Sequence, residues 1–328
     1  MVEPLLIVFI AVGLLFDFLN GFHDSANVVA TVIASQAMSP RVALTISALT
    51  NFIGPFLFGV AVATTIGTEV VSEEAVTVPT AMAALLAAIL WNLITWWLGI
   101  PSSSSHALIG GFVGAAVIGF GFEAIQIRGL TTVLLALLIS PILGFLIGYI
   151  IMVFFLWVGQ GFTPRVNDFF RKAQWITTIT LGLSHGTNDA QKTMGILTFG
   201  LVAFGVIPEF VVPVWIIAIS AGAIALGTAL GGWRLIRTMG AGFYRIRAVH
   251  AFTSQVASTA VILSAALLGG PVSTTQVISS TIVGAGSAER VNMIRWRLAT
   301  QIAMAWLLTI PATFILGAVF YLLLVAIL

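Results

Sequence analysis

The sequence contains no cysteine, and only 7% of its 328 residues are charged. The lack of cysteine excludes disulfide bonds, zinc–thiolate sites and thiol chemistry. The low charge separates the chain from ordinary soluble domains, in which about a quarter of the residues are charged. The chain also lacks a nucleotide-binding loop, so an ATP-driven pump would need a partner subunit. We expect no cofactor and no nucleic-acid partner.

Apolar residues dominate the sequence, in which 59% of the residues are hydrophobic. A helix needs about 20 apolar residues to cross a bilayer. Runs of that length recur at 43–66, 80–99, 130–158, 210–231 and 298–328. The first apolar run has no basic segment before it and no cleavage site, so we read it as a retained helix. The sequence predicts an all-α polytopic membrane protein embedded in the lipid bilayer.

The charged loops predict an orientation, because cytoplasmic loops of membrane proteins carry an excess of lysine and arginine. We place one group of loops in the cytoplasm, the loops that hold Arg41, Arg165, Arg171, Lys172, Arg234, Arg237, Arg245, Arg247, Arg290, Arg295 and Arg297. The loops between them are mainly acidic and face outward, with Glu3, Glu69, Glu73, Glu74, Glu123 and Glu209. This pattern predicts a multi-pass protein of the cell membrane with both termini outside.

The chain divides into two similar halves, residues 1–158 and 175–328, joined by a cytoplasmic linker at 159–174. The segment "NGFHDSAN" at 20–27 is repeated as "HGTNDAQK" at 185–192, and "PSSSSH" at 101–106 as "PVSTTQ" at 271–276. Under the charge pattern the halves have opposite orientations. We therefore expect two inverted-topology repeats, each with a broken first helix and a re-entrant hairpin, at 80–121 and 248–286. Many secondary transporters build a central site in this way.

The two hairpins each combine a proline with a run of hydroxyl residues. Proline and serine or threonine are typical of helix starts, and a helix N-terminus attracts anions. Two facing helix starts can hold a tetrahedral oxyanion. The candidate ligands are Ser103, Ser104, Ser105, Ser273, Thr274 and Thr275. The alternative is that these residues only cap the helices or tighten a helix contact.

The first pair of motifs carries acidic residues at membrane depth, where an ionised carboxylate costs about 3 kcal/mol or more. Asp24 and Asp189 must therefore be paired, protonated or bound to a cation. With Asn27 and Asn188 they offer oxygen ligands for a coupling ion, either Na⁺ or H⁺. Asp17 lies two turns before Asp24, and both a structural and a functional role are open for it.

Basic and titratable residues accompany these acids. Lys192 replaces the asparagine that closes the first motif, and its expected role is charge compensation for Asp189 or Asp24. Histidine titrates near neutral pH, so His23 is a candidate proton carrier beside Asp24. For His106 and His185 the sequence favours a structural role.

The four motifs together resemble the inorganic phosphate transporter (PiT) family, and they occur in the same order over nearly the whole chain. By this resemblance Asp24, Asn27, Asn188 and Asp189 coordinate cations, the hydroxyl residues of the hairpins contact phosphate, and the protein is a homodimer. Two departures, His23 and Lys192, replace neutral amides of the eukaryotic members. They resemble the bacterial carriers of the low-affinity type, which are thought to couple to protons and to carry metal-phosphate.

The resulting hypothesis is a phosphate symporter that works by alternating access, driven by protons or sodium. A sulfate permease of the same fold is the first alternative, although sulfate has no O–H group to donate to Asp24 or Asp189. An intramembrane serine hydrolase using Ser104 or Ser105 with His106 is a remote alternative, because adjacent residues are badly placed for base catalysis. A channel is disfavoured by ionisable groups at both motifs.

Overall fold

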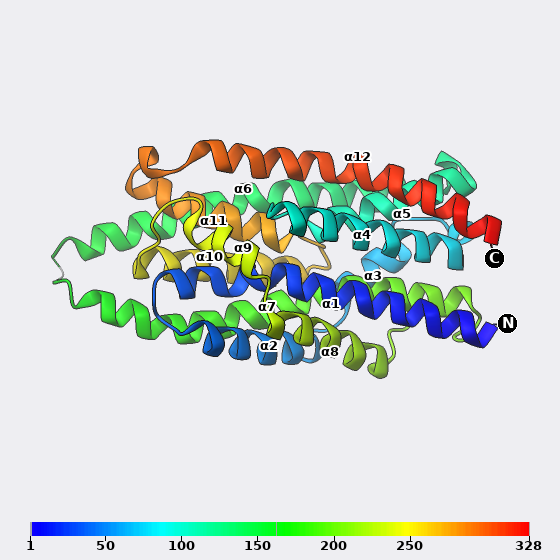
Figure 1. The fold of residues 1–328 in the computed structure, drawn as a ribbon, viewed down its shortest axis with the longest axis horizontal. Coiled ribbons are helices and arrows are strands. Elements are labelled where there is room, and N and C mark those ends of the chain that lie inside the picture. Colours follow the sequence, from blue (N-terminus) through cyan, green and yellow to red (C-terminus); the bar gives the residue numbers. More distant parts are fainter. Residues whose placement is uncertain (1, 162, 328) are drawn as a thin grey trace.

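The protein is built from helices, as the sequence predicts. The computed structural model describes residues 2–161 and 163–327, and in this part of the chain the only β-type pairing is an isolated bridge between Val71 and Ile125. The α-helices in chain order (Figure 1) are α1 (Val2–Ala34), α2 (Pro40–Leu57), α3 (Ala61–Thr68), α4 (Val78–Leu98), α5 (Ser104–Phe120), α6 (Ile127–Val158), α7 (Val166–Ala203), α8 (Val214–Leu230), α9 (Trp233–Ala241), α10 (Ala248–Leu267), α11 (Thr274–Glu289) and α12 (Trp296–Ile327).

Five of these helices are long and apolar enough to cross a membrane, namely α1, α4, α6, α10 and α12. The number rises to seven if each of two bent pairs, α2 with α3 and α8 with α9, counts as one span. The multi-pass prediction is thereby confirmed. The helix α7 is as long as the spanning helices, but the polar residues of its central segment lower its hydropathy.

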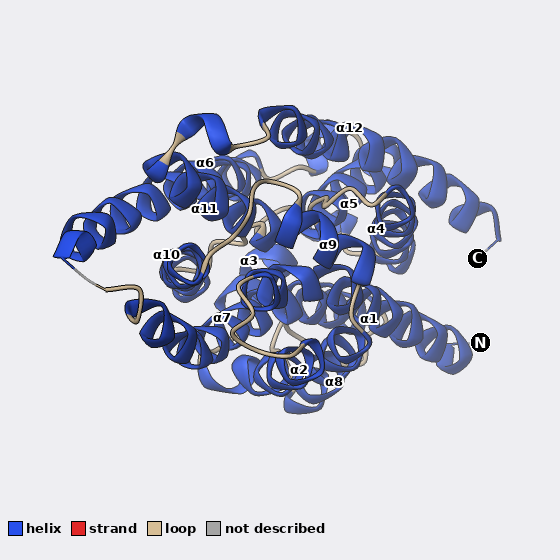
Figure 2. Ribbon diagram, turned by 60° about the vertical axis from the view of Figure 1, so that its left-hand side comes forward, coloured by secondary structure: helices blue, strands red, loops and turns tan. Residues whose placement is uncertain are grey.

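The order of elements repeats in the two halves of the chain. Each half has a long helix, a bent pair, a hairpin of two helices and a second long helix. In Figure 2, α6 and α12 lie on one side of the bundle, α2 and α8 on the other, with α1 and α7 between them. The contacts are matched as well, because α1 packs on α8 as α7 packs on α2, and α6 packs on α11 as α12 packs on α5.

Glycine contacts show how closely the halves match. A Cβ at Gly21 of α1 would lie 2.1 Å from the carbonyl oxygen of Ile224, and one at Gly186 of α7 would lie 2.4 Å from that of Asn51. Both glycines are therefore required for backbone-to-backbone packing. The helices α1 and α7 run antiparallel, because Gly13 faces Leu197 while the earlier Phe9 faces Gly200.

The prediction that the first helix of each half breaks at its polar motif is wrong. The helix α1 runs without interruption through 20–27, and α7 runs through 185–192. Glycine weakens a helix by only about 1 kcal/mol and does not end it unless other signals join it. The motif glycines allow close packing, and the polar side chains project from intact helices.

The chain breaks elsewhere, at two bends that the sequence analysis did not predict. The bend between α2 and α3 is 74°, and the bend between α8 and α9 is 70°. Side chains of the polar motifs cap the backbone there: Gln191 accepts the N–H groups of Val62 (2.8 Å) and Ala63 (3.2 Å), and Ser25 accepts the N–H of Gly232 (2.7 Å). These bonds satisfy backbone donors that cannot be left unpaired in a membrane.

The two predicted hairpins, α4–α5 and α10–α11, are present. They lie in opposite halves of Figure 1, and their tips meet in the middle, where Ser105 donates to the carbonyl of Val272 (3.0 Å). Proline, glycine and hydroxyl residues interrupt the helix at 99–103 and 268–273. The hydroxyls of Ser103 and Ser273 then cap α5 and α11.

The charged loops gather as the orientation predicts. Arg237 and Arg245 belong to one basic segment and Arg295 to another, both assigned to the same side, and the three residues line one cavity of about 470 Å³. Glu73 and Glu209, both assigned to the other side, line a second cavity of about 590 Å³. The helix α1 begins and α12 ends at the same end of the molecule (Figure 1).

Candidate functional site

Asp24 and Asp189 lie together at the centre of the molecule, on the facing helices α1 and α7. An oxygen atom of each carboxylate and a ring nitrogen of His185 lie within 4.8 Å of one another. All three side chains are fully buried. The sequence predicted both aspartates at this centre. It favoured a purely structural role for His185, which the structure places one helical turn from Asp189.

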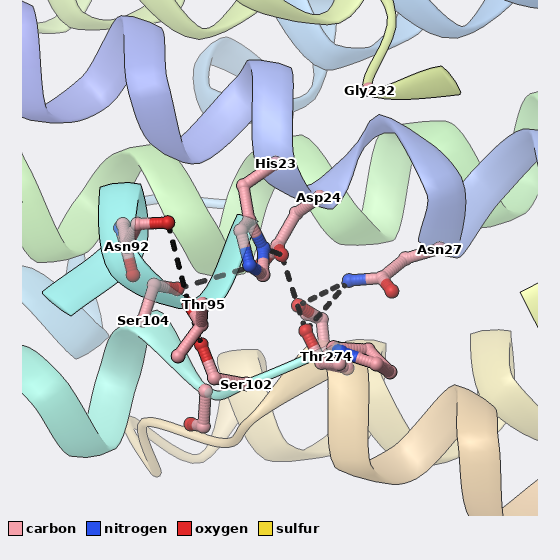
Figure 3. Close-up of polar contacts among 12 residues, drawn as sticks. His23, Asp24, Asn27, Asn92, Thr95, Ser102, Ser104, Gly232 and Thr274 are labelled. Carbon is pink, nitrogen blue, oxygen red and sulfur yellow. Dashed lines mark hydrogen bonds and ion pairs between the residues drawn. The ribbon is translucent and has the colours of Figure 1, made fainter. Parts of the chain in front are cut away.

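The surroundings of Asp24 are titratable or hydroxylic (Figure 3). His23 Nδ1 lies 2.6 Å from Oδ1 of Asp24. Thr275 donates to the same oxygen (3.2 Å), and Ser104 donates to Oδ2 (3.5 Å). Asp24 thus has no permanently charged partner within the described residues, and its charge is balanced only when a proton or a cation is present.

His23 also connects this centre to a cavity. The side chain lines a cavity of about 280 Å³ between α1, α4 and α8, whose other residues include Phe18, Asn92 and Trp96. Its second ring nitrogen, Nε2, has no hydrogen-bond partner within the described residues. His23 therefore contacts Asp24 through one ring nitrogen and also lines this cavity.

Asp189 has a fixed cation. Lys192, one turn later on α7, donates to Oδ1 of Asp189, and Asn188 donates to the same oxygen (2.9 Å). Thr274 donates to Oδ2 (3.0 Å), which lies 3.1 Å from His185 Nε2. The Lys192 side chain is completely buried. Lys192 thus contacts Asp189 in the structure, which is one of the pairings that the sequence left open.

Side chains of both α1 and α7 bind the tip of the second hairpin, α10–α11. Asn27 of α1 donates to Thr275 (3.0 Å) and Thr274 (3.4 Å). Asn188 of α7 donates to the carbonyl of Val272 (3.0 Å) and accepts from its N–H (3.4 Å). The tip of the first hairpin contacts these motifs only through Ser104 among the described side-chain hydrogen bonds. The two hairpins are therefore tied to the centre unequally.

The predicted hydroxyl ligands divide by position. Ser103 and Ser273 are N-caps, because each accepts a backbone N–H three residues later, from His106 (3.1 Å) and Gln276 (3.3 Å). Ser104, Thr274 and Thr275 point to the aspartates, and Ser105 points to the other hairpin. All six are buried. Ser103 and Ser273 therefore cap helices, and the other four hydroxyl residues lie at the centre.

A hydrolase is not supported by this geometry. His106 Nδ1 contacts the capping residue Ser103 (2.7 Å), and its Nε2 faces Gln276 of the other hairpin (3.4 Å). Within the described residues it bonds neither Ser104 nor Ser105, so neither hydroxyl has this base. His106 instead links the two hairpin tips.

The four residues expected to hold sodium do not form a free set of oxygen ligands. The oxygen of Asn188 accepts the N–H of Val272, and Oδ1 of Asp189 accepts from two donors. Hard cations bind several oxygen atoms at once, and hydrogen-bond donors compete for these oxygens. Asp24, His185 and Asp189 are the described residues whose ligand atoms lie close enough together for a metal ion, and the carboxylate oxygens of both aspartates also accept hydrogen bonds from hydroxyl groups.

The fold and this site define a multi-pass membrane protein built around a fully buried polar centre. The chain belongs to the phosphate transporter family, whose model matches residues 20–317. This confirms the resemblance seen in the motifs.

Similar proteins agree with this assignment. The chain is 42% identical to a probable low-affinity inorganic phosphate transporter of Rhizobium meliloti (strain 1021), over 97% of this chain and 96% of the relative. It is 40% identical to a protein of the same description from Bacillus subtilis (strain 168), with the same coverage. A solved structure described as the sodium-dependent phosphate transporter matches with a TM-score of 0.89 and 24% identity, over 99% of this chain and 100% of that one. This likeness shows the fold.

Proposed function

We propose that the protein is a proton-coupled symporter of inorganic phosphate that works by alternating access. The observation that carries this proposal is the meeting of two aspartates with two hydroxyl-lined helix starts, with a lysine already paired to one of the aspartates. Such a site can bind an anion only if the remaining carboxylate charge is neutralised. The binding of phosphate and the binding of a positive charge are then linked.

Phosphate binds between the starts of α5 and α11. These helix N-termini carry partial positive charge and unpaired backbone N–H groups. Ser104, Ser105, Thr274 and Thr275 add hydroxyls that donate to phosphate oxygens. The O–H groups of phosphate can donate in turn to Asp24 or Asp189, which sulfate cannot do, and an acceptor left unpaired in a buried site is costly. The aspartates therefore favour phosphate over sulfate.

The coupling proton binds at the His23–Asp24 pair. Asp189 already carries the Lys192 ammonium, so a second cation there would meet repulsion. Asp24 has a histidine and hydroxyls instead, and histidine changes its charge near neutral pH. Protonation of this pair removes the negative charge that opposes phosphate. In this account Lys192 takes over part of the neutralising role of a sodium ion.

The similarity of the two halves of the chain supports alternating access. Their matched glycine contacts and the antiparallel course of α1 and α7 support an inverted repeat, which lets the same site open to either side. The contact between Ser105 and Val272 joins the two hairpin tips. Separation of the tips on one side or the other would expose phosphate alternately.

A metal-phosphate complex is a second candidate cargo, favoured by one observation. Asp24, His185 and Asp189 present their ligand atoms within 4.8 Å of one another, a spacing suited to a divalent cation. These residues would then hold a divalent ion that enters with phosphate, and the phosphate charge would offset the repulsion between this ion and Lys192. The homodimer implied by the family resemblance stays a prediction.

Uptake of labelled phosphate into proteoliposomes tests the substrate, with unlabelled phosphate and sulfate as competitors. Phosphate should compete fully and sulfate weakly. Thr274→Ser should retain uptake, and Thr274→Val, which loses the hydroxyl, should weaken the apparent affinity by roughly tenfold, since each 1.4 kcal/mol is a factor of ten. Equal competition by sulfate, or no effect of the valine variant, would contradict the proposed site.

A further inference from the structure

Asp17 is a buried acid that the central site does not use. It lies on α1 two turns before Asp24, and its side chain is completely buried. In the part of the chain that the structure describes, neither carboxylate oxygen has a hydrogen-bond partner. The ion pairs within these residues do not include Asp17 either. An ionised carboxylate in this position is costly, so Asp17 needs a proton or another positive charge.

Two hydroxyls from other helices lie beside this carboxylate. They belong to Thr193 of α7 and Ser220 of α8, and neither meets the geometry of a hydrogen bond. Both hydroxyls are fully buried and have no other partner within the described residues. Many hydroxyls in these helices donate to a carbonyl of the preceding turn, as Thr187 does. Thr193 and Ser220 do not, so their hydroxyls are available to Asp17.

The three helices hold these groups in fixed positions. The backbones of α1 and α8 touch at Gly21 and Ile224, and α1 meets α7 where Gly13 faces Leu197. Asn20, one turn from Asp17, also has an amide without a hydrogen-bond partner within the described residues. Rigid helices, rather than a flexible loop, therefore surround the carboxylate with polar groups.

We propose that Asp17 is a second proton-binding site, which takes up and releases one proton in each transport cycle. This inference rests on the proposed function, because it assumes proton-coupled transport. A hydroxyl can both donate and accept a hydrogen bond. When Asp17 is ionised, Thr193 and Ser220 can both donate to it. When it is protonated, its O–H donates to one hydroxyl and its carbonyl oxygen accepts from the other, so both states are satisfied and the only reactant is a proton.

The charges around Asp17 link this proton to the central site. The ionised side chains that face it are Asp189 and Lys192 of α7. The helices α4 and α8 contain no ionisable residue, and α1 itself contributes His23 and Asp24 about two turns away. Because Asp189 and Lys192 form a neutral pair, an entering phosphate changes the local charge. The added negative charge favours protonation of Asp17, and phosphate and this proton therefore bind together.

The second half of the chain has no equivalent acid. The motif repeat aligns Asp17 with Gly182, where a Cβ would lie 2.0 Å from the hydroxyl oxygen of Thr50. The glycine contacts align Ser220 with Ser47, which is also buried with an unpartnered hydroxyl among the described residues. The proton site exists only in the first half, and Ser47 offers a matched control for Ser220.

The test is the steady-state accumulation of phosphate in proteoliposomes as the imposed pH difference is varied. Each coupled proton contributes up to about a tenfold accumulation per pH unit. Asp17→Asn keeps the shape and neutral charge of the protonated acid but cannot exchange its proton. It should lower accumulation by about tenfold per pH unit, while phosphate–phosphate exchange at equal pH continues. Ser220→Ala should alter the pH dependence of uptake, and Ser47→Ala should not.

The outcomes separate this inference from the proposed function. If the wild-type protein transports phosphate without responding to a pH gradient, proton coupling as a whole is contradicted. If the wild type responds and Asp17→Asn responds equally, only the role of Asp17 is contradicted. Should the asparagine variant fail to fold, infrared spectra of the wild type decide: a protonated-carboxyl band that shifts in Ser220→Ala but not in Ser47→Ala supports the inference, and a band insensitive to both overturns it.

Discussion

Lys192 and Asp189 lie one turn apart on α7 and form an ion pair in which neither side chain is exposed. Removing one partner of a buried pair strands the other charge and costs about 3–5 kcal/mol. We therefore expect Lys192→Met and Asp189→Asn each to lower the thermal stability of the protein in detergent. The double variant should be more stable than the sum of the two single effects predicts. Additive effects in this double-mutant cycle would show that the two residues do not form a pair.

Asp24 tests the coupling site, because it receives no fixed cation. We expect Asp24→Asn to abolish phosphate uptake and to leave the fold intact, since asparagine has the same shape and can still accept from Thr275. Uptake into proteoliposomes and elution from a sizing column measure the two effects. Glu209→Gln makes the same chemical change in an exposed loop and should transport normally. Wild-type uptake by Asp24→Asn would rule out a coupling role for this residue.

Gly21 tests the packing that positions Asp24. A methyl group at Gly21 would lie 2.1 Å from a carbonyl oxygen of α8, so Gly21→Ala must push α1 and α8 apart. We expect a loss of at least about 1–3 kcal/mol, the usual cost of overpacking. Gly222 of α8 is the control, because a Cβ there meets no atom within 4 Å. Gly222→Ala should be neutral or slightly stabilising, and equal effects of the two substitutions would contradict this packing.

Two matched loop positions test the inverted topology. Glu123 and Asn292 are exposed and lie in the short 3₁₀ turns that follow the two hairpins. The charge pattern predicts that Glu123 faces outward and Asn292 faces the cytoplasm. In intact cells a membrane-impermeant thiol reagent should label Glu123→Cys and leave Asn292→Cys unlabelled. The native chain has no cysteine to interfere. Labelling of both positions from one side would contradict an inverted repeat.

Composition predicted the helical class and the spans, because a long apolar run in a membrane has few ways other than a helix to satisfy its backbone hydrogen bonds. Loop charge predicted that like-charged loops gather. Proline and hydroxyl runs predicted the two hairpins, because these residues are typical of the place where one helix ends and the next begins. The motif segments were interpreted wrongly: their glycine and polar residues suggested helix breaks at 20–27 and 185–192, whereas the glycines allow close contact with the backbone of a neighbouring helix. This packing depends on contacts between α1 and α8 and between α7 and α2, which no local pattern reveals.

The sequence predicted the residues of the candidate site better than it predicted the contacts between them. Asp24 and Asp189 lie together, and the hydroxyls of Ser104, Thr274 and Thr275 contact them. This was expected, because an acid at membrane depth must have a partner. The approach of His185 to both aspartates was not predicted, although its spacing of four residues before Asp189 places both on one face of a continuous helix. The bends after α2 and α8 were also missed, because the side chains that cap them, Gln191 and Ser25, come from distant helices.

The measurement that tests the central claim most directly is phosphate uptake by the wild-type protein under two separate gradients. Proteoliposomes without sodium receive an inward proton gradient, and a matched set receives an inward sodium gradient at equal pH. With Lys192 fixed on Asp189 and His23 on Asp24, we expect the proton gradient alone to drive accumulation and the sodium gradient to add nothing. Accumulation that requires sodium would contradict the account.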